Sequence, residues 1–160
     1  MLRDDINEAL KTAMKASDPV SRDALRLIVA AMKNKDVDAR AKVPVEQRAP
    51  GNQPGIGDDE IRQMLQGMVK QRHESIALYE KGNRPELAAK ERGEIAVIER
   101  FLPKQLDDAG IEAAVKAAIA ETGAASVKDT GKVMGVLKQK HAGALDMAKA
   151  GAAVRKLLGG

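Results

Sequence analysis

The chain has 160 residues, of which 44% are apolar and 31% charged, a composition typical of one ordinary globular domain or two small ones. Aromatic residues make up 1% of the chain, with only Tyr79 and Phe101, and there is no Trp or Cys. This composition disfavours β-sheets and excludes base-stacking aromatic platforms, disulfides, thiol nucleophiles and Cys-ligated metals. The net charge of +4 is mildly basic, and either a solvated helical face or an anionic partner would account for it.

Two helices are predicted at the N-terminus. Apolar residues recur every four positions from Ile6 through Leu10 to Met14 and predict a first helix with one apolar stripe. Asp18 is a typical N-cap, because the proline that follows it fits the first position of a helix. The second helix is expected to end near Lys35 and to bury four apolar side chains: Leu25, Ile28, Val29 and Met32.

Residues 36–57 interrupt this helical pattern. Few large apolar residues occur there, and prolines and glycines are frequent, which predicts a long mobile loop. The glycines at its end do not form a dinucleotide-binding fingerprint, because no strand precedes them and the third glycine of the motif is missing. The six prolines and glycines of this segment are Pro44, Pro50, Gly51, Pro54, Gly55 and Gly57.

Two longer helices are predicted next. Asp58 or Asp59 would cap the third helix, which Gly82 would end, and the fourth would begin near Pro85. Pro103 disfavours a helical conformation in the residue before it and therefore marks the expected domain boundary. The third helix is expected to carry one apolar side: Ile61, Met64, Leu65, Met68, Ile76 and Tyr79.

Three shorter helices are predicted after the boundary. In the last of them Ala150, Val154 and Leu157 are expected to face inward. The sequence thus predicts an all-α fold, with a helical N-terminal domain over residues 1–102 and a small three-helix C-terminal domain over residues 103–160. The expected caps of these three helices are Asp107 or Asp108, then Ser126 with Asp129 as a capping box, and Asp146.

The sequence contains no recognisable catalytic or metal-binding motif. His73 begins a zincin-like pattern, but Ala77 stands where the second His ligand is needed, and His141 is far away in sequence. Carboxylate pairs such as Glu91 and Glu94 are ordinary on a charged helix face. We therefore expect no catalytic residue, no metal and no cofactor.

The first residues and the apolar runs bear on localisation. Acidic Asp4 and Asp5 are unlike a signal or transit peptide, and the longest apolar run, residues 27–32, is far shorter than the roughly 20 residues of a membrane span. We expect a cytoplasmic protein that does not bind membranes.

Two glycines four residues apart form the sharpest pattern. Gly131 and Gly135 share one face of a predicted helix, although glycine costs about 0.5–1 kcal/mol there relative to alanine. Either a neighbouring helix crosses closely at this face, or a phosphate backbone approaches it between Lys128 and Lys132. From Gly131 onward the chain has one acid, Asp146, and six basic residues: Lys132, Lys138, Lys140, Lys149, Arg155 and Lys156.

Several segments together resemble the YqeY-like (GatB/YqeY) family, and the resemblance covers nearly the whole chain. They are residues 70–76, Tyr79-Glu80-Lys81-Gly82, Arg84, Leu87-Ala88, Lys90-Glu91, Glu94-Ile95, Leu102-Pro103-Lys104-Gln105-Leu106, Gly123-Ala124 and Asp129-Thr130-Gly131-Lys132-Val133-Met134-Gly135.

The C-terminal region of that family is similar to the tail domain of the B subunit of the glutamine-dependent aspartyl/glutamyl-tRNA amidotransferase. The resemblance therefore implies an all-helical protein with a GatB-tail-like domain over residues 103–160. It also implies that the chain binds tRNA or associates with amidotransferase subunits. Family members are often labelled carbon–nitrogen ligases with glutamine as amido-N-donor, but these residues supply no ATP site and no glutaminase nucleophile, so we expect no catalysis by the chain alone.

Departures from the family pattern are few. Thr130 stands where Met is commoner, and Met147 and Ala148 replace a glycine and a basic residue after Asp146, which puts one backbone contact to RNA in doubt.

Three functions follow as hypotheses. In the first, the C-terminal domain binds tRNA through phosphate contacts. In the second, the chain is a helical adaptor that binds a protein partner through its N-terminal domain, near Ile76, Tyr79 and the 36–57 loop. In the third, it supports glutamine-dependent amidation within a complex. The candidate RNA-binding residues are Lys128, Gly131, Lys132, Gly135, Lys138, Lys140, Arg155 and Lys156.

Overall fold

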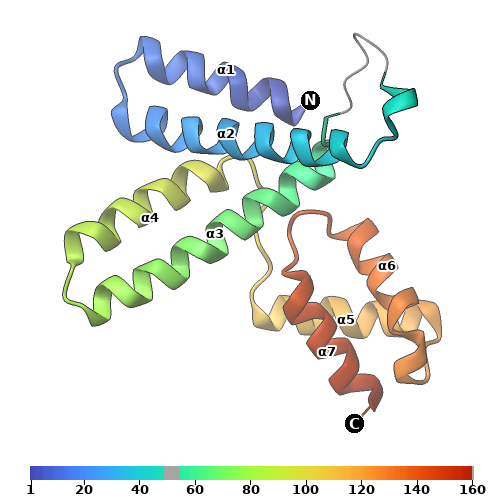
Figure 1. Ribbon diagram of the computed structural model, residues 1–160. Helices are drawn as coiled ribbons and strands as arrows, with labels where there is room; N and C mark the ends of the chain where they lie inside the picture. The colour runs from blue at the N-terminus through green and yellow to red at the C-terminus, as the bar shows by residue number, and fades with distance from the viewer. Residues whose placement is uncertain (49–54, 160) are drawn as a thin grey trace. The chain divides into compact units, whose positions relative to one another are not determined.

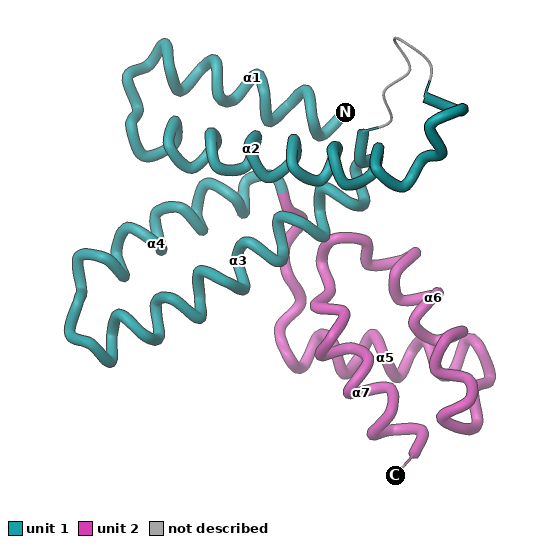
Figure 2. The backbone as a smooth tube through the Cα atoms, in the orientation of Figure 1, with its two compact units in different colours: residues 1–101 teal, residues 102–160 magenta. Residues whose placement is uncertain are grey.

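The computed structural model describes residues 1–48 and 55–159, and within them it contains only helices and connecting segments (Figure 1). The prediction of an all-α fold is confirmed. The chain divides into two compact units, residues 1–101 and residues 102–160 (Figure 2). In the described part of the chain, no helix is both long and apolar enough to cross a membrane.

The N-terminal unit is built from four helices. Helix α1 packs on α2, α3 forms a hairpin with α4, and α2 packs on α4 (Figure 1). Their bounds are Leu2–Lys15 for α1, Pro19–Ala41 for α2, Asp58–Lys81 for α3 and Pro85–Glu99 for α4. An aliphatic core holds them together, and its largest fully buried side chains are Ile6, Leu25, Ile28, Met32, Ile61, Leu65, Val97 and Ile98.

Local signals place several helix ends where the sequence predicts them. The Asp18 side chain accepts the backbone N–H of Ser21 at 3.1 Å, with Pro19 at the first helical position. Helix α3 ends before Gly82, and α4 begins at Pro85. Each of these signals acts within one helical turn.

Other expectations for this unit are wrong. Helix α2 continues to Ala41, six residues beyond Lys35, and residues 45–47 form a short 3-10 turn, so much of the predicted 36–57 loop is helical. The remainder of that prediction falls partly on residues 49–54, which lie outside the described residues. Helix α3 is capped from Gly57, whose N–H donates to Glu60 at 3.1 Å, and Asp58 and Asp59 lie in its first turn.

The C-terminal unit is a three-helix bundle. Its helices are α5 (Asp108–Thr122), α6 (Thr130–Lys140) and α7 (Met147–Gly159), with a 3-10 turn over Val127–Asp129 before α6. All three helices pack on one another. The core consists of Ile111, Val115, Ala118, Val133, Leu137, Leu145, Ala150 and Val154.

The predicted caps of this unit are present. The Asp107 carboxylate accepts the N–H of Gly110 at 2.7 Å, and Gly123 ends α5 with a left-handed φ of +65°. Asp129 accepts two backbone N–H groups in the 3-10 turn before α6, and Asp146 accepts two at the start of α7. These side chains satisfy backbone donors that the first turn of a helix leaves unpaired.

The segment that leads into this unit is hydrogen-bonded to the turn between α6 and α7. The Gln105 side-chain amide donates to the carbonyl of Gly143 at 2.6 Å, and the N–H of Leu106 donates to the carbonyl of Ala144 at 2.8 Å. These two bonds join positions almost forty residues apart and fix the beginning of the unit against the turn between α6 and α7.

Two apolar side chains expected in the cores are exposed. Met14 is 53% exposed, and its neighbour Ala13 is buried in its place. Leu157 is 41% exposed, whereas Gly151 and Val154 of the same helix are buried. In both helices the buried face turns away from the last position of the predicted apolar stripe.

Candidate functional site

The outer surface of α6 carries two bare glycine positions. A Cβ atom built on Gly131 or on Gly135 would meet no atom of the described residues within 4 Å, so none of the described helices crosses there. The reading that a helix packs closely on these two glycines is therefore wrong. The glycine at the crossing of α6 and α7 is instead buried Gly151, whose Cβ position lies 3.9 Å from Cε of Met134. Gly151 was missed because its neighbours are small and uncharged, so no sequence signal singled it out.

The periodicity of α6 places these glycines opposite the core. Val133 and Leu137 are buried, and at 100° per residue Gly131 and Gly135 fall on the far side of the helix. Because neither has a side chain, the helix backbone itself forms the surface between the flanking lysines. The α6 outer face, as we call it, consists of the exposed residues Lys128, Gly131, Lys132, Gly135 and Lys138.

The lysines of this face have no carboxylate partner. Within the described residues, Lys128, Lys132 and Lys138 form no ion pair, so their charges are available to a ligand. The nearest acid is Asp129, whose pKa is lowered by hydrogen bonds from the N–H groups of Ala125 and Ser126, and further by Lys132. Oδ2 of Asp129 already accepts hydrogen bonds from these two N–H groups, so the carboxylate neutralises Lys132 only in part.

The other three candidate cations lie away from this face. Lys140 is paired with Glu121 of α5. The guanidinium of Arg155 lies over its own helix, with Nη1 3.3 Å from the Cβ position of Gly151. Lys156 lines a groove between α5 and α7 beside Glu112. The structure therefore brings five of the eight candidate residues together and separates Lys140, Arg155 and Lys156 from them.

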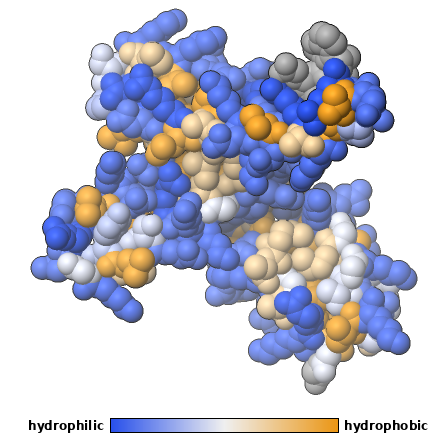
Figure 3. Space-filling view, in the orientation of Figure 1, coloured by the Kyte–Doolittle hydropathy of each residue, from blue (hydrophilic) through white to orange (hydrophobic). Residues whose placement is uncertain are grey.

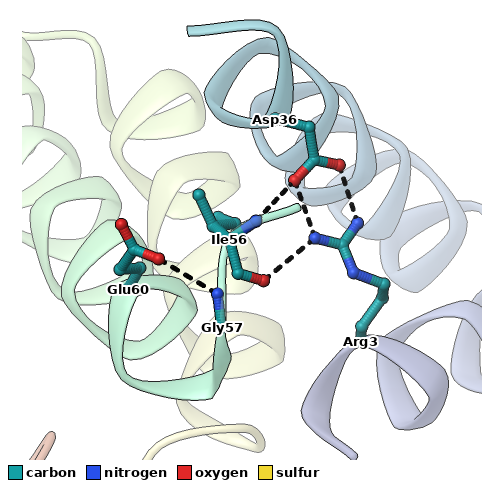
Figure 4. Close-up of polar contacts among 5 residues, drawn as sticks. All are labelled: Arg3, Asp36, Ile56, Gly57 and Glu60. Carbon is teal, nitrogen blue, oxygen red and sulfur yellow. Dashed lines mark hydrogen bonds and ion pairs between the residues drawn. The ribbon is translucent and has the colours of Figure 1, made fainter. Parts of the chain in front are cut away.

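A polar cluster in the N-terminal unit links three segments (Figure 4). Arg3 of α1 makes a bidentate ion pair with Asp36 of α2, with both N–O distances 2.8 Å, and donates to the carbonyl of Ile56 at 3.2 Å. The N–H of Ile56 donates to the same Asp36 carboxylate at 2.9 Å. The hydrogen bonds from Arg3 and the N–H of Ile56 hold the pKa of Asp36 below its usual value.

This cluster fixes the chain at the start of α3. Asp36 is buried at 7% exposure, yet every lone pair that faces the cluster has a donor. The sequence placed Asp36 at the start of a loop because prolines and glycines follow it and few large apolar residues do, and its partners lie 33 and 20 positions away, where no local pattern indicates them. The arrangement is a structural clamp, since both Asp36 oxygens, both Arg3 Nη atoms and the backbone N–H and carbonyl of Ile56 bond within it.

A second ion cluster joins α3 to α4. Arg72 lies 2.9 Å from Glu94 and 4.0 Å from Glu91, and all three side chains are largely buried. Beside it Ile76 packs against Ala88 and Ile95 with Tyr79 over them. The carboxylate pair is thus part of the packing of the hairpin. Ile76 belongs to the same packed cluster and presents no docking surface.

The described residues contain no group of three or more potential His, Asp or Glu ligands for a metal ion. His73 is exposed on α3, and His141 belongs to the other unit. The expectation that the chain needs neither metal nor catalytic group stays a prediction.

Comparison with known families shows to which family the chain belongs. The family model described as Yqey-like protein matches residues 3–158, which is almost the entire chain. The chain belongs to the YqeY-like family. The family resemblance derived from the sequence is therefore confirmed.

Relatives of this YqeY-like protein include several fungal proteins. They are named Altered inheritance of mitochondria protein 41, mitochondrial. The protein from Lachancea thermotolerans is 26% identical over 98 residues, 61% of this chain and 46% of the relative. The Eremothecium gossypii protein is 30% identical over 97 residues, again 61% of this chain and 46% of the relative. The chain thus matches just under half the length of these relatives, and their names state no ligand or reaction.

Proposed function

We propose that this YqeY-like protein binds tRNA through the α6 outer face, as a non-catalytic RNA-binding or amidotransferase-associated protein. The observation that supports the proposal is the combination of three unpaired lysines with an uncovered glycine surface. Phosphates approach the backbone of a helix closely only where no side chain keeps them away. Between Lys128, Lys132 and Lys138, the glycines leave such a surface open.

The chemistry of this face favours backbone recognition over base recognition. Tyr79 and Phe101 both lie in the N-terminal unit, so the C-terminal unit has no Phe, Tyr or Trp on which a base can stack, and its one imidazole, His141, is half-buried. Lysines are point charges that contact phosphates without reading a base. We therefore expect the face to recognise the shape of a folded RNA.

The number of gathered lysines sets the expected salt dependence. Three phosphate contacts predict a slope of log affinity against log salt of about −2 to −3, taking roughly 0.7 to 0.9 per contact. Phosphate contacts from all six candidate cations would give a steeper slope, but Lys140 is neutralised by Glu121 and Lys156 lies on another surface. Filter binding or fluorescence anisotropy with full-length chain and unfractionated tRNA at several salt concentrations measures the slope.

A charge-matched pair of variants tests the face itself. Replacing Lys128, Lys132 and Lys138 by Glu changes the net charge from +4 to −2, and so does replacing Lys15, Lys33 and Lys70 of the N-terminal unit. We expect the first variant to lose tRNA binding by at least about 100-fold at low salt, and the second to lose far less. Equal losses in both variants would show that net charge alone attracts the RNA.

The adaptor hypothesis of an N-terminal protein partner has less support. Ile76, one of its two named side chains, is buried in the hairpin core, and Tyr79 is half-buried beside it. For localisation we propose the cytoplasm, because a chain without cysteine fits a reducing compartment. The relatives named above are mitochondrial by name, so cell fractionation of the tagged chain in its own host decides this point.

A further inference from the structure

A second surface of the C-terminal unit lies between α5 and α7. It is a groove of about 420 Å³, which we call the α5–α7 groove. Its floor is aliphatic and contains Ile111 of α5 and Leu157 of α7, the leucine that was expected in the core and is 41% exposed. The groove residues are Asp108, Ile111, Glu112, Lys149, Ala152, Ala153, Lys156 and Leu157. Figure 3 shows apolar surface gathered on the C-terminal unit among hydrophilic atoms.

The two rims of the groove carry opposite charges. Asp108 and Glu112 lie one turn apart along α5, and Lys149 and Lys156 lie along α7. Asp108 and Lys149 reach each other at 3.2 Å and bridge one end of the groove. Toward the other end, Lys156 forms no ion pair within the described residues, although its charge, after that of Lys116, lowers the pKa of Glu112.

The shape and charge of this groove select one kind of occupant. From Lys149 to Leu157 the α7 rim extends over about two helical turns, or roughly 12 Å. A convex helix with an aliphatic stripe fills such a groove, whereas a second copy would place one hollow against another. RNA is disfavoured, because the carboxylates of Asp108 and Glu112 would face its phosphates.

We propose that the α5–α7 groove binds an amphipathic α-helix of a partner protein, with an aliphatic stripe on the floor, basic residues along the edge over α5 and acidic residues along the edge over α7. The charges fix which way the helix is rotated about its axis, because exchanging its two edges would set like charges against each other. This surface is separate from the α6 outer face, so the unit can contact RNA and a protein helix through different residues.

Two synthetic peptides test this arrangement against the full chain. Each peptide is a helix of about four turns with Leu at positions i, i+3, i+4 and i+7. The first peptide carries Lys on the edge that faces α5 and Glu on the edge that faces α7. The control peptide carries Glu toward α5 and Lys toward α7. Fluorescence anisotropy should show the first peptide binding at least about threefold more tightly, as expected for two exposed charge pairs. Leu157→Asp should abolish binding of both peptides, because it puts a carboxylate on the floor.

Exchanging the rim charges supplies the decisive variant. The double substitution Glu112→Lys and Lys156→Glu should reverse the preference between the two peptides. Glu112 pairs with Lys116 at 3.0 Å, but this pair is exposed and contributes little to stability, so the helical circular dichroism should stay unchanged. Equal binding of the two peptides, or a preference that the exchange does not reverse, overturns the proposal. A dimer in sedimentation that Leu157→Asp dissociates also overturns it, because the groove would then be an interface between copies.

The same peptides separate this surface from the RNA face. Lys128→Glu with Lys132→Glu should leave peptide affinity unchanged while it weakens tRNA binding. If that variant also loses the peptide, the groove is not the peptide's site and the proposal fails, whatever becomes of tRNA binding.

Discussion

Substitutions at Gly135 can separate an effect on stability from an effect on tRNA binding. It lies inside α6, and a Cβ atom at this position meets nothing within 4 Å. Alanine is favoured over glycine in a helix interior by about 0.5–1 kcal/mol, because glycine loses more backbone entropy on folding. Gly135→Ala should therefore raise the free energy of unfolding of the C-terminal unit by this amount.

The expected shift is measurable because the unit is small. Residues 102–160 form the unit, and for domains near this size 1 kcal/mol corresponds to about 4–8 °C in Tm. Gly135→Ala should therefore raise the Tm of the C-terminal transition by about 2–8 °C in differential scanning calorimetry of the full chain.

Two other glycines provide controls of known environment. Gly123 has a φ of +65°, so Gly123→Ala should destabilise the unit by about 1 kcal/mol. At buried Gly151 an added Cβ comes within 3.3 Å of Arg155, which must move, so the gain from Gly151→Ala should be smaller than at Gly135. A loss of stability in Gly135→Ala would refute the reasoning, because it would mean that another group covers this face.

The same position links stability to the proposed function. Gly135→Leu keeps a good helix former on an open face, but its side chain stands where a phosphate backbone would approach. We expect a folded protein with weaker tRNA binding. A natural glycine that lowers stability on an open helix face is then explained by the ligand that it admits.

Two further predictions concern the N-terminal unit. Asp36→Asn should lower its free energy of unfolding by about 1.5–3 kcal/mol in urea, whereas the exposed control Asp38→Asn should have little effect. The pKa of Asp36 is lower in the folded than in the unfolded protein. The difference in free energy of unfolding between the wild type and Asp36→Asn should therefore be complete above about pH 4, the unfolded pKa, and should disappear as the pH falls further. A difference that does not change with pH contradicts the ion pair. Arg72→Met should lower the free energy of unfolding by about 3–5 kcal/mol, because Glu94 is left buried without its partner. The double variant Arg72→Met with Glu94→Met should recover most of that loss. If the losses of the two single variants add in the double variant, the interpretation is wrong.

The parts of the fold that could be predicted from the sequence depend on interactions within one turn. Asp18, Asp107 and Asp146 each accept a backbone N–H two or three residues ahead, and Gly123 ends its helix by its own φ angle. A reader of the sequence needs no knowledge of the tertiary structure to place these ends. The family resemblance rests on the residues of several short segments along the chain, and it too is confirmed.

Most of the errors involve partners that are distant in sequence. The prolines, glycines and few large apolar residues after Lys35 suggested a loop from Asp36 onward, but Asp36 lies in α2, and its partner Arg3 in another helix makes its burial favourable. Leu157 was assigned to the core from its spacing, although the packing of α7 turns that position toward the groove. Spacing alone could not distinguish an open glycine such as Gly135 from a packed one such as Gly151, because that difference depends on where the neighbouring helix crosses.

The acids of α5 explain why one basic unit presents two different surfaces. Lys149 is paired with Asp108 and Lys140 with Glu121, so α5 neutralises two of the lysines that lie near it. No carboxylate on α6 performs this role for its outer face, because the helix has no acid from Thr130 to Lys140. Three lysines that form no ion pair within the described residues therefore lie together on the α6 outer face, although the basic residues are spread over α6 and α7. On the α5 side the same residue types form a mixed-charge groove, which is better suited to a protein helix than to a phosphate chain.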